Sequence, residues 1–278
     1  MIHPVIKYIK ARKNKKVPIN DGRKIVMVNF GGFMTGAYSA GAMLALVEMG
    51  YQNSFDSIYT ISSGFHNACS FLSGDGYRNT SVYYEDLCRD NFFKPERIWK
   101  MIDIEKLVDI LKYKKPINVS NLLKQKTKLY VRLANTDKKK EEYVEVHQLG
   151  KSKFFDLVRA AASVPFLSPG KIKLGRNKYE DPIWFDNRMV EHLDYVTQTN
   201  ATDIVVIYNQ YSQFEYIKKH FKSLNHSRFL NIYPKKAWRL SRFENNPEVL
   251  KQASRRIGKK VKSLFGLKSG ITLFESNK

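Results

Sequence analysis

Short apolar runs recur along this chain, and most are followed by a turn and a segment with helical periodicity. The clearest runs occupy residues 25–28, 58–61, 203–208 and 228–233. Continuous apolar runs of this length are typical of strands that are buried on both faces of a sheet. Because such strands alternate with helical segments, the pattern predicts an α/β fold with a largely parallel central sheet.

The segments between these strands are predicted as helices and as one hairpin. Apolar positions at helical spacing indicate helices at about residues 34–49, 154–162 and 247–262, and a weaker helical pattern at residues 81–126. Alternation of apolar and polar residues predicts a hairpin from residues 128–133 and 142–149. The last helix is basic and amphipathic, so it either lies on anionic lipid or packs its apolar stripe against the sheet.

The remaining segments are assigned from their turn residues and charges. Residues 170–179 are rich in Gly and Lys and are predicted to form a turn, whereas residues 182–187 are predicted as an apolar strand that delivers Asp186. Residues 1–22 are a basic N-terminal lead-in, and their run from Lys10 to Lys16 is expected to be a solvated arm. We therefore expect one domain at residues 23–278.

Two predicted strand-to-helix switches carry the groups that a hydrolytic site needs. Ser62 follows the second strand, and Gly64 allows a sharp turn into the next helix, which is the pattern of a nucleophile elbow. The first switch contains Gly31, Gly32 and Phe33, whose backbone N–H groups are candidate donors to an oxyanion. Taken singly, a Gly-Gly pair is commonly a plain turn, and a Ser at this position is commonly a helix cap.

The same two switches resemble motifs of the patatin-like phospholipases. The first motif of that family, Gly-Gly-Gly-x-Arg-Gly, is similar to residues 31–36, and its Gly-x-Ser-x-Gly motif is similar to residues 60–64. Its Asp-containing turn is similar to residues 186–188, which follow an Ala- and Ser-rich helix ending in Pro165. Four departures are present, and they are Phe33, Thr35, Thr60 and the pair Asn187-Arg188.

The resemblance covers roughly residues 24–210, and more faintly residues 233–244. It implies a three-layer α/β/α fold and a lipid acyl hydrolase of the phospholipase A or lysophospholipase type. It also implies a Ser62–Asp186 dyad with no catalytic histidine, an oxyanion hole at Gly31, Gly32 and Phe33, and Gly36 and Gly64 as motif glycines. The expected partner is a phospholipid or another acyl-ester lipid, and no cofactor or metal is expected.

Charge adds a second expectation about partners. The chain has 48 Lys and Arg residues against 26 Asp and Glu residues, a formal net charge of +22. An anionic membrane surface, a nucleic acid or a generally Lys-rich proteome could each account for this excess. Because no nucleic-acid motif accompanies the charge, we expect peripheral contact with anionic membrane and no nucleic acid.

Two further features bear on where the protein acts. No secretory signal and no run of 18 apolar residues is present, so a cytoplasmic protein without a membrane span is expected. The two cysteines, Cys69 and Cys88, supply no disulfide framework, and Cys69 is expected to be a small buried residue.

Several alternatives remain open at this stage. The four motif departures leave room for a catalytically impaired relative that binds lipid or a protein partner. A Ser-His-Asp triad would use His66 or His192, although neither has a spacing that requires catalysis. Ser63 is a rival nucleophile beside Ser62.

Overall fold

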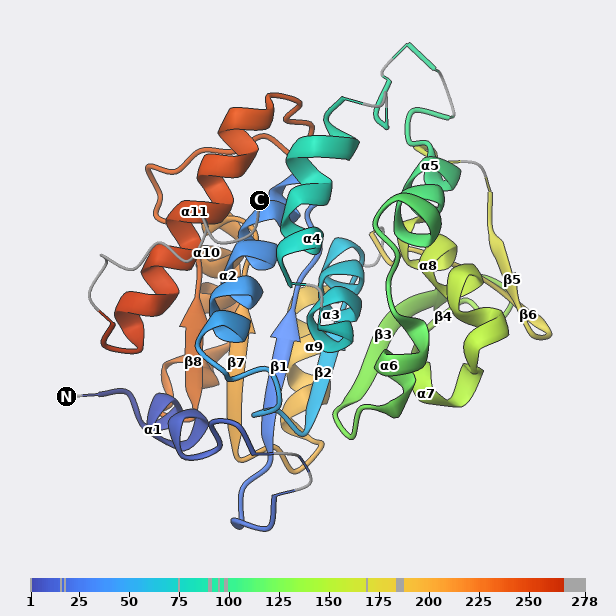
Figure 1. Ribbon diagram of the computed structural model, residues 1–278. Coiled ribbons are helices and arrows are strands. Elements are labelled where there is room, and N and C mark those ends of the chain that lie inside the picture. The colour runs from blue at the N-terminus through green and yellow to red at the C-terminus, as the bar shows by residue number, and fades with distance from the viewer. Residues whose placement is uncertain are drawn as a thin grey trace.

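The computed structural model of this protein has an eight-stranded sheet with helices on both sides (Figure 1). It describes residues 2–15, 17, 19–74, 76–89, 92–94, 96–97, 100–168, 170–183 and 188–267. The strands are β1 (Ile25–Asn29), β2 (Ser57–Thr60), β3 (Lys128–Asn135), β4 (Lys140–Glu145), β5 (Ile172–Leu174), β6 (Asn177–Glu180), β7 (Asp203–Ile207) and β8 (Phe229–Ile232).

The strand order is β5-β6-β3-β2-β1-β7-β8, with β4 paired to β3 outside this path. The central pairs β3–β2, β2–β1, β1–β7 and β7–β8 are parallel, whereas β4, β5 and β6 are added in antiparallel pairs. In the register of the parallel core, Asn29 at the end of β1 lies opposite Thr60 of β2 and Ile207 of β7. The loops that follow these three strands therefore start at one edge of the sheet.

Helices of more than six residues are α1 (Pro4–Ala11), α2 (Gly36–Glu48), α3 (Ser63–Ser73), α8 (Phe154–Ala162), α9 (Arg188–Thr197), α10 (Tyr211–His220) and α11 (Pro247–Leu264). Shorter helical segments are α4 (Gly76–Ser81), α5 (Ile104–Asp109), α6 (Val119–Lys124) and α7 (Val146–Leu149), with π-helical turns at Val82–Leu87 and Ile110–Lys114. Single 3-10 turns lie at Phe33–Thr35, Lys151–Lys153 and Lys222–Asn225.

The alternation of side chains along β1 divides the core into two layers. Ile25 and Met27 pack with residues of α2, α3 and α11, whereas Val26 and Val28 pack with residues of α9 and α10. This is the consequence of the two-residue period of a strand that is covered on both faces. The expected three-layer arrangement with a mostly parallel sheet is confirmed.

Helices α2 and α11 approach each other unusually closely. A Cβ atom on Gly41 would overlap the Ser254 carbonyl oxygen and lie 2.7 Å from the Ser254 Cα atom. Ser254 in turn donates a hydrogen bond from its hydroxyl to the Ala37 carbonyl oxygen at 2.8 Å. The apolar stripe of α11 is thus buried on α2, so the interpretation that this stripe lies on lipid is wrong.

Three sequence predictions need correction. The run from Lys10 to Lys16 is only partly a solvated arm. Lys13 and Lys15 are exposed, but Arg12 is 1% exposed, and α1 before it buries Val5, Ile6 and Ile9 in the core. The predicted turn at residues 170–179 contains the hairpin β5–β6. The second arm of the predicted 128–149 hairpin ends at Glu145, and α7 follows it.

The predicted strand at residues 182–187 also differs from the structure where it can be compared. Strand β6 ends at Glu180, and Pro182 and Ile183 lie beyond it. Proline has no N–H to donate to a strand ladder, so a strand is expected to stop before it. Residues 184–187, including the predicted Asp186 and Asn187, lie outside the described residues.

Candidate active site

Ser62 and the Gly31–Phe33 turn meet at the edge of the sheet where β1 and β2 end. A Cβ atom on Gly31 would lie 2.5 Å from the Cβ atom of Ser62 and 3.1 Å from its Oγ atom. Only a glycine can bring its backbone this close to the serine side chain. The Gly31–Phe33 turn and the turn at Ser62, the two strand-to-helix connections that the sequence predicted, are therefore in direct contact.

The backbone of Ser62 has the conformation of a nucleophile elbow. Its φ is 53° and its ψ is −131°, a combination that an L-residue rarely adopts. Such strained residues cluster at functional sites. Ser62 stands at the N-cap position of α3, but its side chain makes no capping hydrogen bond, so a capping role does not account for it.

Gly64 makes the sharp turn after Ser62 possible. A Cβ atom at this position would lie 2.5 Å from the Asn29 carbonyl oxygen and 2.9 Å from that of Phe30. Helix α3 therefore starts directly against the end of β1. Gly36 at the start of α2 leaves room for neighbouring side chains, because a Cβ atom there would overlap the Tyr83 hydroxyl and lie 3.0 Å from the Ser63 Oγ atom.

The turn at Gly31–Phe33 is held by hydrogen bonds to its carbonyl oxygens. The Gln213 side-chain amide donates to the Gly31 oxygen at 2.8 Å, and the Thr35 hydroxyl donates to the Gly32 oxygen at 2.6 Å. Phe33 itself has a φ of 55°. These contacts fix the orientation of the peptide groups. They also explain why a buried Thr35 is tolerated where the family motif has arginine.

Two small pockets open beside Ser62. One is apolar, with a volume of about 50 Å³, and its lining includes Met34, Val82, Leu107, Leu111 and Val164. The other has a volume of about 30 Å³ and is lined by Gly31, Gly32, Asp181, Gln213 and Arg242 among others. Both pockets are small, so an acyl chain would have to widen the one that it enters.

Among the described residues, Asp181 is the carboxylate that lines a pocket with Ser62. It follows β6 directly, is 4% exposed, and lines the same pocket as Ser62. Its backbone N–H donates to the Ser163 carbonyl oxygen at 2.8 Å, which ties it to the end of α8. Sequence reasoning missed Asp181 because it predicted a turn over residues 170–179 and a strand over residues 182–187, which left Asp181 between the two. Pro182 was the signal that the strand ends one residue before Asp181.

The two histidines of the triad alternative occupy different environments. His66 lines the apolar pocket, and burial lowers its pKa to about 4. Its Nδ1 atom has no hydrogen-bond partner among the described residues, so no acid orients the ring as a triad requires. His192 lies on the other face of the sheet, where its Nδ1 atom is 2.7 Å from the Tyr143 hydroxyl. Burial, then the nearby Arg132, lower the His192 pKa to about 3.

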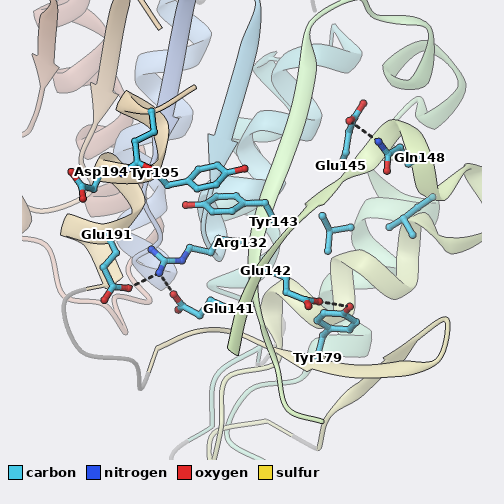
Figure 2. A pocket seen from close by; sticks show the side chains of 13 residues that line it. Arg132, Glu141, Glu142, Tyr143, Glu145, Gln148, Tyr179, Glu191, Asp194 and Tyr195 are labelled. Atoms are coloured by element: carbon cyan, nitrogen blue, oxygen red, sulfur yellow. Dashed lines mark hydrogen bonds and ion pairs between the residues drawn. The ribbon is translucent and has the colours of Figure 1, made fainter. Parts of the chain in front are cut away.

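A larger hollow, of about 760 Å³, lies away from Ser62 between β4 and α9 (Figure 2). Its lining combines tyrosines with acidic side chains, and the described residues that line it include no serine, cysteine or histidine. Arg132 forms ion pairs with Glu141 and with Glu191, the latter at 2.7 Å, and Glu142 accepts a hydrogen bond from Tyr179. Burial would raise the Glu142 pKa, but hydrogen bonds lower it to about 2.

Other kinds of site were sought in the part of the chain that the structure describes. No group of three or more His, Cys, Asp or Glu side chains there could hold a metal ion. No helix in those ranges is long and apolar enough to cross a membrane. Cys69 is buried, as expected, and Cys88 is partly buried.

Fold and site together define an α/β protein with a serine on a strained strand-to-helix turn. The sequence model of the Patatin-like phospholipase family matches residues 30–194, more than half of the chain. This chain therefore belongs to the patatin-like phospholipase family, whose members are in general lipid acyl hydrolases. No curated protein matches the chain by sequence.

The solved structure of VipD supports the fold assignment. The crystal structure of VipD from Legionella pneumophila is similar, with a TM-score of 0.53 and 10% identity, over 88% of this chain and 67% of that chain. A chain of the complex of full-length SpcU with full-length ExoU, from the type III secretion system of Pseudomonas aeruginosa, has a TM-score of 0.38 and 12% identity. That match covers 87% of this chain and 53% of the other. At such identities the likeness concerns the fold and not the function.

Proposed function

We propose that this protein hydrolyses the acyl ester bonds of lipids, with Ser62 as the nucleophile. The single observation that supports this most is the contact of Ser62 with the Gly31 turn on a strained backbone. In the proposed reaction, the Ser62 Oγ atom attacks the acyl carbonyl carbon, and the alcohol leaves. Water then attacks the acyl-enzyme, which releases the fatty acid and restores the serine.

A carboxylate would accept the Ser62 proton and pass it to the leaving alcohol oxygen. The proposed dyad has two candidates for this base, Asp181 and Asp186. Asp181 is supported by its burial in the pocket of Ser62. Asp186 is supported by the motif resemblance alone. Because an aspartate with an ordinary pKa near 3.9 is a weak base, positioning must supply most of its effect.

The Gly31 turn is the proposed oxyanion hole. Backbone N–H groups of Gly31, Gly32 and Phe33 would stabilise the charge that develops on the carbonyl oxygen, at about 3–4 kcal/mol for each well-aimed donor. The hydrogen bonds that hold the Gly31 and Gly32 carbonyl oxygens support this role, because a preorganised donor costs no reorganisation during the reaction.

The acyl chain is proposed to enter the apolar pocket beside Ser62, and the protein is proposed to work at an anionic membrane surface. The lining by Met34, Leu107 and Leu111 favours a hydrocarbon chain. Membrane contact is supported by the net charge of +22 and by Arg255, Arg256 and Lys259, which are exposed on the outer face of α11.

Labelling of the purified protein with a fluorophosphonate probe tests the proposal. We expect stoichiometric modification of the wild type, mapped to Ser62 and not Ser63 by peptide mass analysis, and none in Ser62→Ala. If Asp181 is the base, Asp181→Asn slows labelling on the order of 100-fold or more, whereas Asp186→Asn changes it little. The exposed Asp109→Asn is the matched control.

Two other outcomes would change the conclusion. Slow labelling of Asp186→Asn with normal labelling of Asp181→Asn would assign the base to Asp186. A folded wild-type protein that is not labelled, even with anionic vesicles present, would contradict the hydrolase. That result would favour a relative that binds lipid or a protein partner without hydrolysis, the alternative that the motif departures suggest.

A further inference from the structure

Two side chains from the connection between β7 and α10 hold the start of the proposed oxyanion turn. The Asn209 side-chain amide donates to the Phe30 carbonyl oxygen, and the Gln213 side-chain amide donates to the Gly31 oxygen at 2.8 Å. A trans peptide group is planar, so its N–H group points away from its carbonyl oxygen. Holding these two oxygens therefore fixes the directions of the N–H groups of Gly31 and Gly32.

The end of the turn is held by other parts of the chain. The Thr35 hydroxyl donates to the Gly32 carbonyl oxygen at 2.6 Å, which fixes the direction of the Phe33 N–H group. The next N–H group, that of Met34, donates to the Arg242 carbonyl oxygen at 3.1 Å, which attaches the segment between β8 and α11 to the turn. Each of four successive peptide groups thus has a support of its own.

The N–H groups of residues 31–33 remain free to bind a ligand. None of the three donates to an acceptor among the described residues, although the N–H groups on either side do. The preceding one, that of Phe30, donates to the Ile207 carbonyl oxygen at 3.3 Å. All three residues line the pocket that contains Ser62. Successive free N–H groups beside a nucleophile are suited to an oxygen that becomes anionic.

The orientation of each side-chain amide is determined by its partners. The Asn209 Oδ1 atom accepts from the Ser39 N–H group at 3.0 Å, so its Nδ2 atom is the donor to the turn. The Gln213 Oε1 atom accepts from the N–H groups of Asn209 and Gln210 at 2.9 and 3.2 Å, so its Nε2 atom is the donor. Because a backbone N–H group only donates and a carbonyl oxygen accepts, neither amide can turn over without losing these bonds.

We propose that Gln213 and Asn209 are positioning residues that aim the N–H groups of Gly32 and Gly31 at the oxyanion of the transition state. This inference rests on the proposed hydrolysis at Ser62. It assigns the geometry of the oxyanion hole to two side chains beyond residues 30–194, the part of the chain that the family model matches. Each side chain acts through the peptide group that it holds. Because the oxyanion forms only after the serine attacks, their loss should lower kcat and leave KM nearly unchanged.

Gln213→Glu is the sharpest variant for the test. It keeps the length of the side chain and the acceptor for the two N–H groups, but it replaces the donor to Gly31 with a second oxygen. With p-nitrophenyl butyrate we expect kcat to fall about 100-fold or more and KM to change less than about threefold, because loss of one oxyanion donor lowers kcat by about 10²–10³. Gln198→Glu changes an exposed glutamine in the same way and is the matched control.

A neutral variant separates the lost donor from the added charge. Gln213→Met keeps a side chain of similar length without a hydrogen bond to Gly31, and it should also lower kcat with little change in KM. Gln213 is 7% exposed, whereas Asn209 is 0% exposed, so Gln213 is the better position to change without unfolding the protein. If Gln213→Met has the kcat of the wild type, the loss in Gln213→Glu is an effect of charge and the inference is wrong.

A measurement on the turn itself needs no turnover. Gly31-Gly32 is the one pair of adjacent glycines in the sequence. In protein labelled with glycine that carries both ¹³C in its carbonyl group and ¹⁵N, an HNCO spectrum therefore selects the Gly32 amide alone. We expect its ¹H and ¹⁵N resonances to move in Gln213→Glu and Gln213→Met, and to stay in place in Gln198→Glu.

An unchanged Gly32 resonance in both Gln213 variants would overturn the inference, as would a loss that appears in KM instead of kcat. The same loss in Gln198→Glu would also overturn it. An inactive wild type would contradict the hydrolysis at Ser62 and not the positioning, which the Gly32 resonance would then decide by itself.

Discussion

Two buried histidines predict a specific dependence of stability on pH. His66 is 8% exposed and His192 is 0% exposed, and burial lowers their pKa values from 6.5 to about 4 and about 3. Between these values and pH 6.5 the unfolded chain binds protons that the folded protein does not. The contribution of the two neutral histidines to the free energy of unfolding is therefore fully present above pH 6.5, and it is lost as the pH falls toward their pKa values in the folded state.

The size of the effect follows from the two pKa values of each histidine. On going from pH 7 to pH 5, the folded state loses about 2 kcal/mol relative to the unfolded state for His66 and about the same for His192. Together they lower the free energy of unfolding by about 4 kcal/mol, a large part of the 5–15 kcal/mol that is typical of a domain. The lowered carboxyl pKa of Glu142 acts mainly below pH 5 and does not interfere.

Urea unfolding at pH 7 and pH 5 measures this loss in the wild type and in His66→Leu. Leucine removes the titrating group and the unpartnered Nδ1 atom, so the variant should be at least as stable as the wild type at pH 5 and should lose about 2 kcal/mol less between the two pH values. The exposed His226→Gln is the control and should follow the wild type. An identical loss in the wild type and His66→Leu would refute the reasoning.

Two further predictions concern packing and buried charge, and urea unfolding measures both. Gly41→Ala should destabilise the protein by at least about 2 kcal/mol because its Cβ atom would overlap Ser254. Gly258→Ala should be nearly neutral, because its Cβ atom would lie 3.3 Å from the nearest atom, the Gly41 carbonyl oxygen. Equal effects would mean that α11 shifts freely on α2. Arg12→Met should lower the free energy of unfolding by about 3–5 kcal/mol, because it leaves the carboxylates of Asp21 and Asp56 without the guanidinium group that they pair with. A loss of stability in Arg12→Met no larger than that in Lys7→Met, a substitution of an exposed residue, would contradict this prediction.

The parts of the fold that depend on local pattern were predictable from the sequence. Strands β1, β2 and β7 are short apolar runs, and α8 has the predicted bounds of residues 154–162. The contact of Ser62 with the Gly31 turn was also predictable, because neighbouring parallel strands deliver their carboxyl ends to one edge. The spacing of apolar residues and the positions of glycines are sufficient to predict such features.

Features that depend on distant partners were not predictable. Arg12 lies in a Lys-rich run that has the composition of a solvated arm. Its burial depends on partners in the fold, which are the carboxylates of Asp21 and Asp56 and the carbonyl oxygens of Arg23 and Ser54. Asp181 joins the site because β6 ends before Pro182, which no hydrophobic pattern shows. Arg242 reaches the site through tertiary contacts alone, and its spacing in the sequence contains no trace of them.

The order in which the chain leaves the ribosome has a consequence for this site. Ser62 and the Gly31 turn are made early, but Gln213, which holds the Gly31 carbonyl oxygen, and the segment that carries Arg242 are made much later. Helix α11, which covers α2, comes later still. A growing chain thus contains Ser62 long before these supports. On the proposed function, full esterase activity begins only after the segment that carries Arg242 and helix α11 have been made.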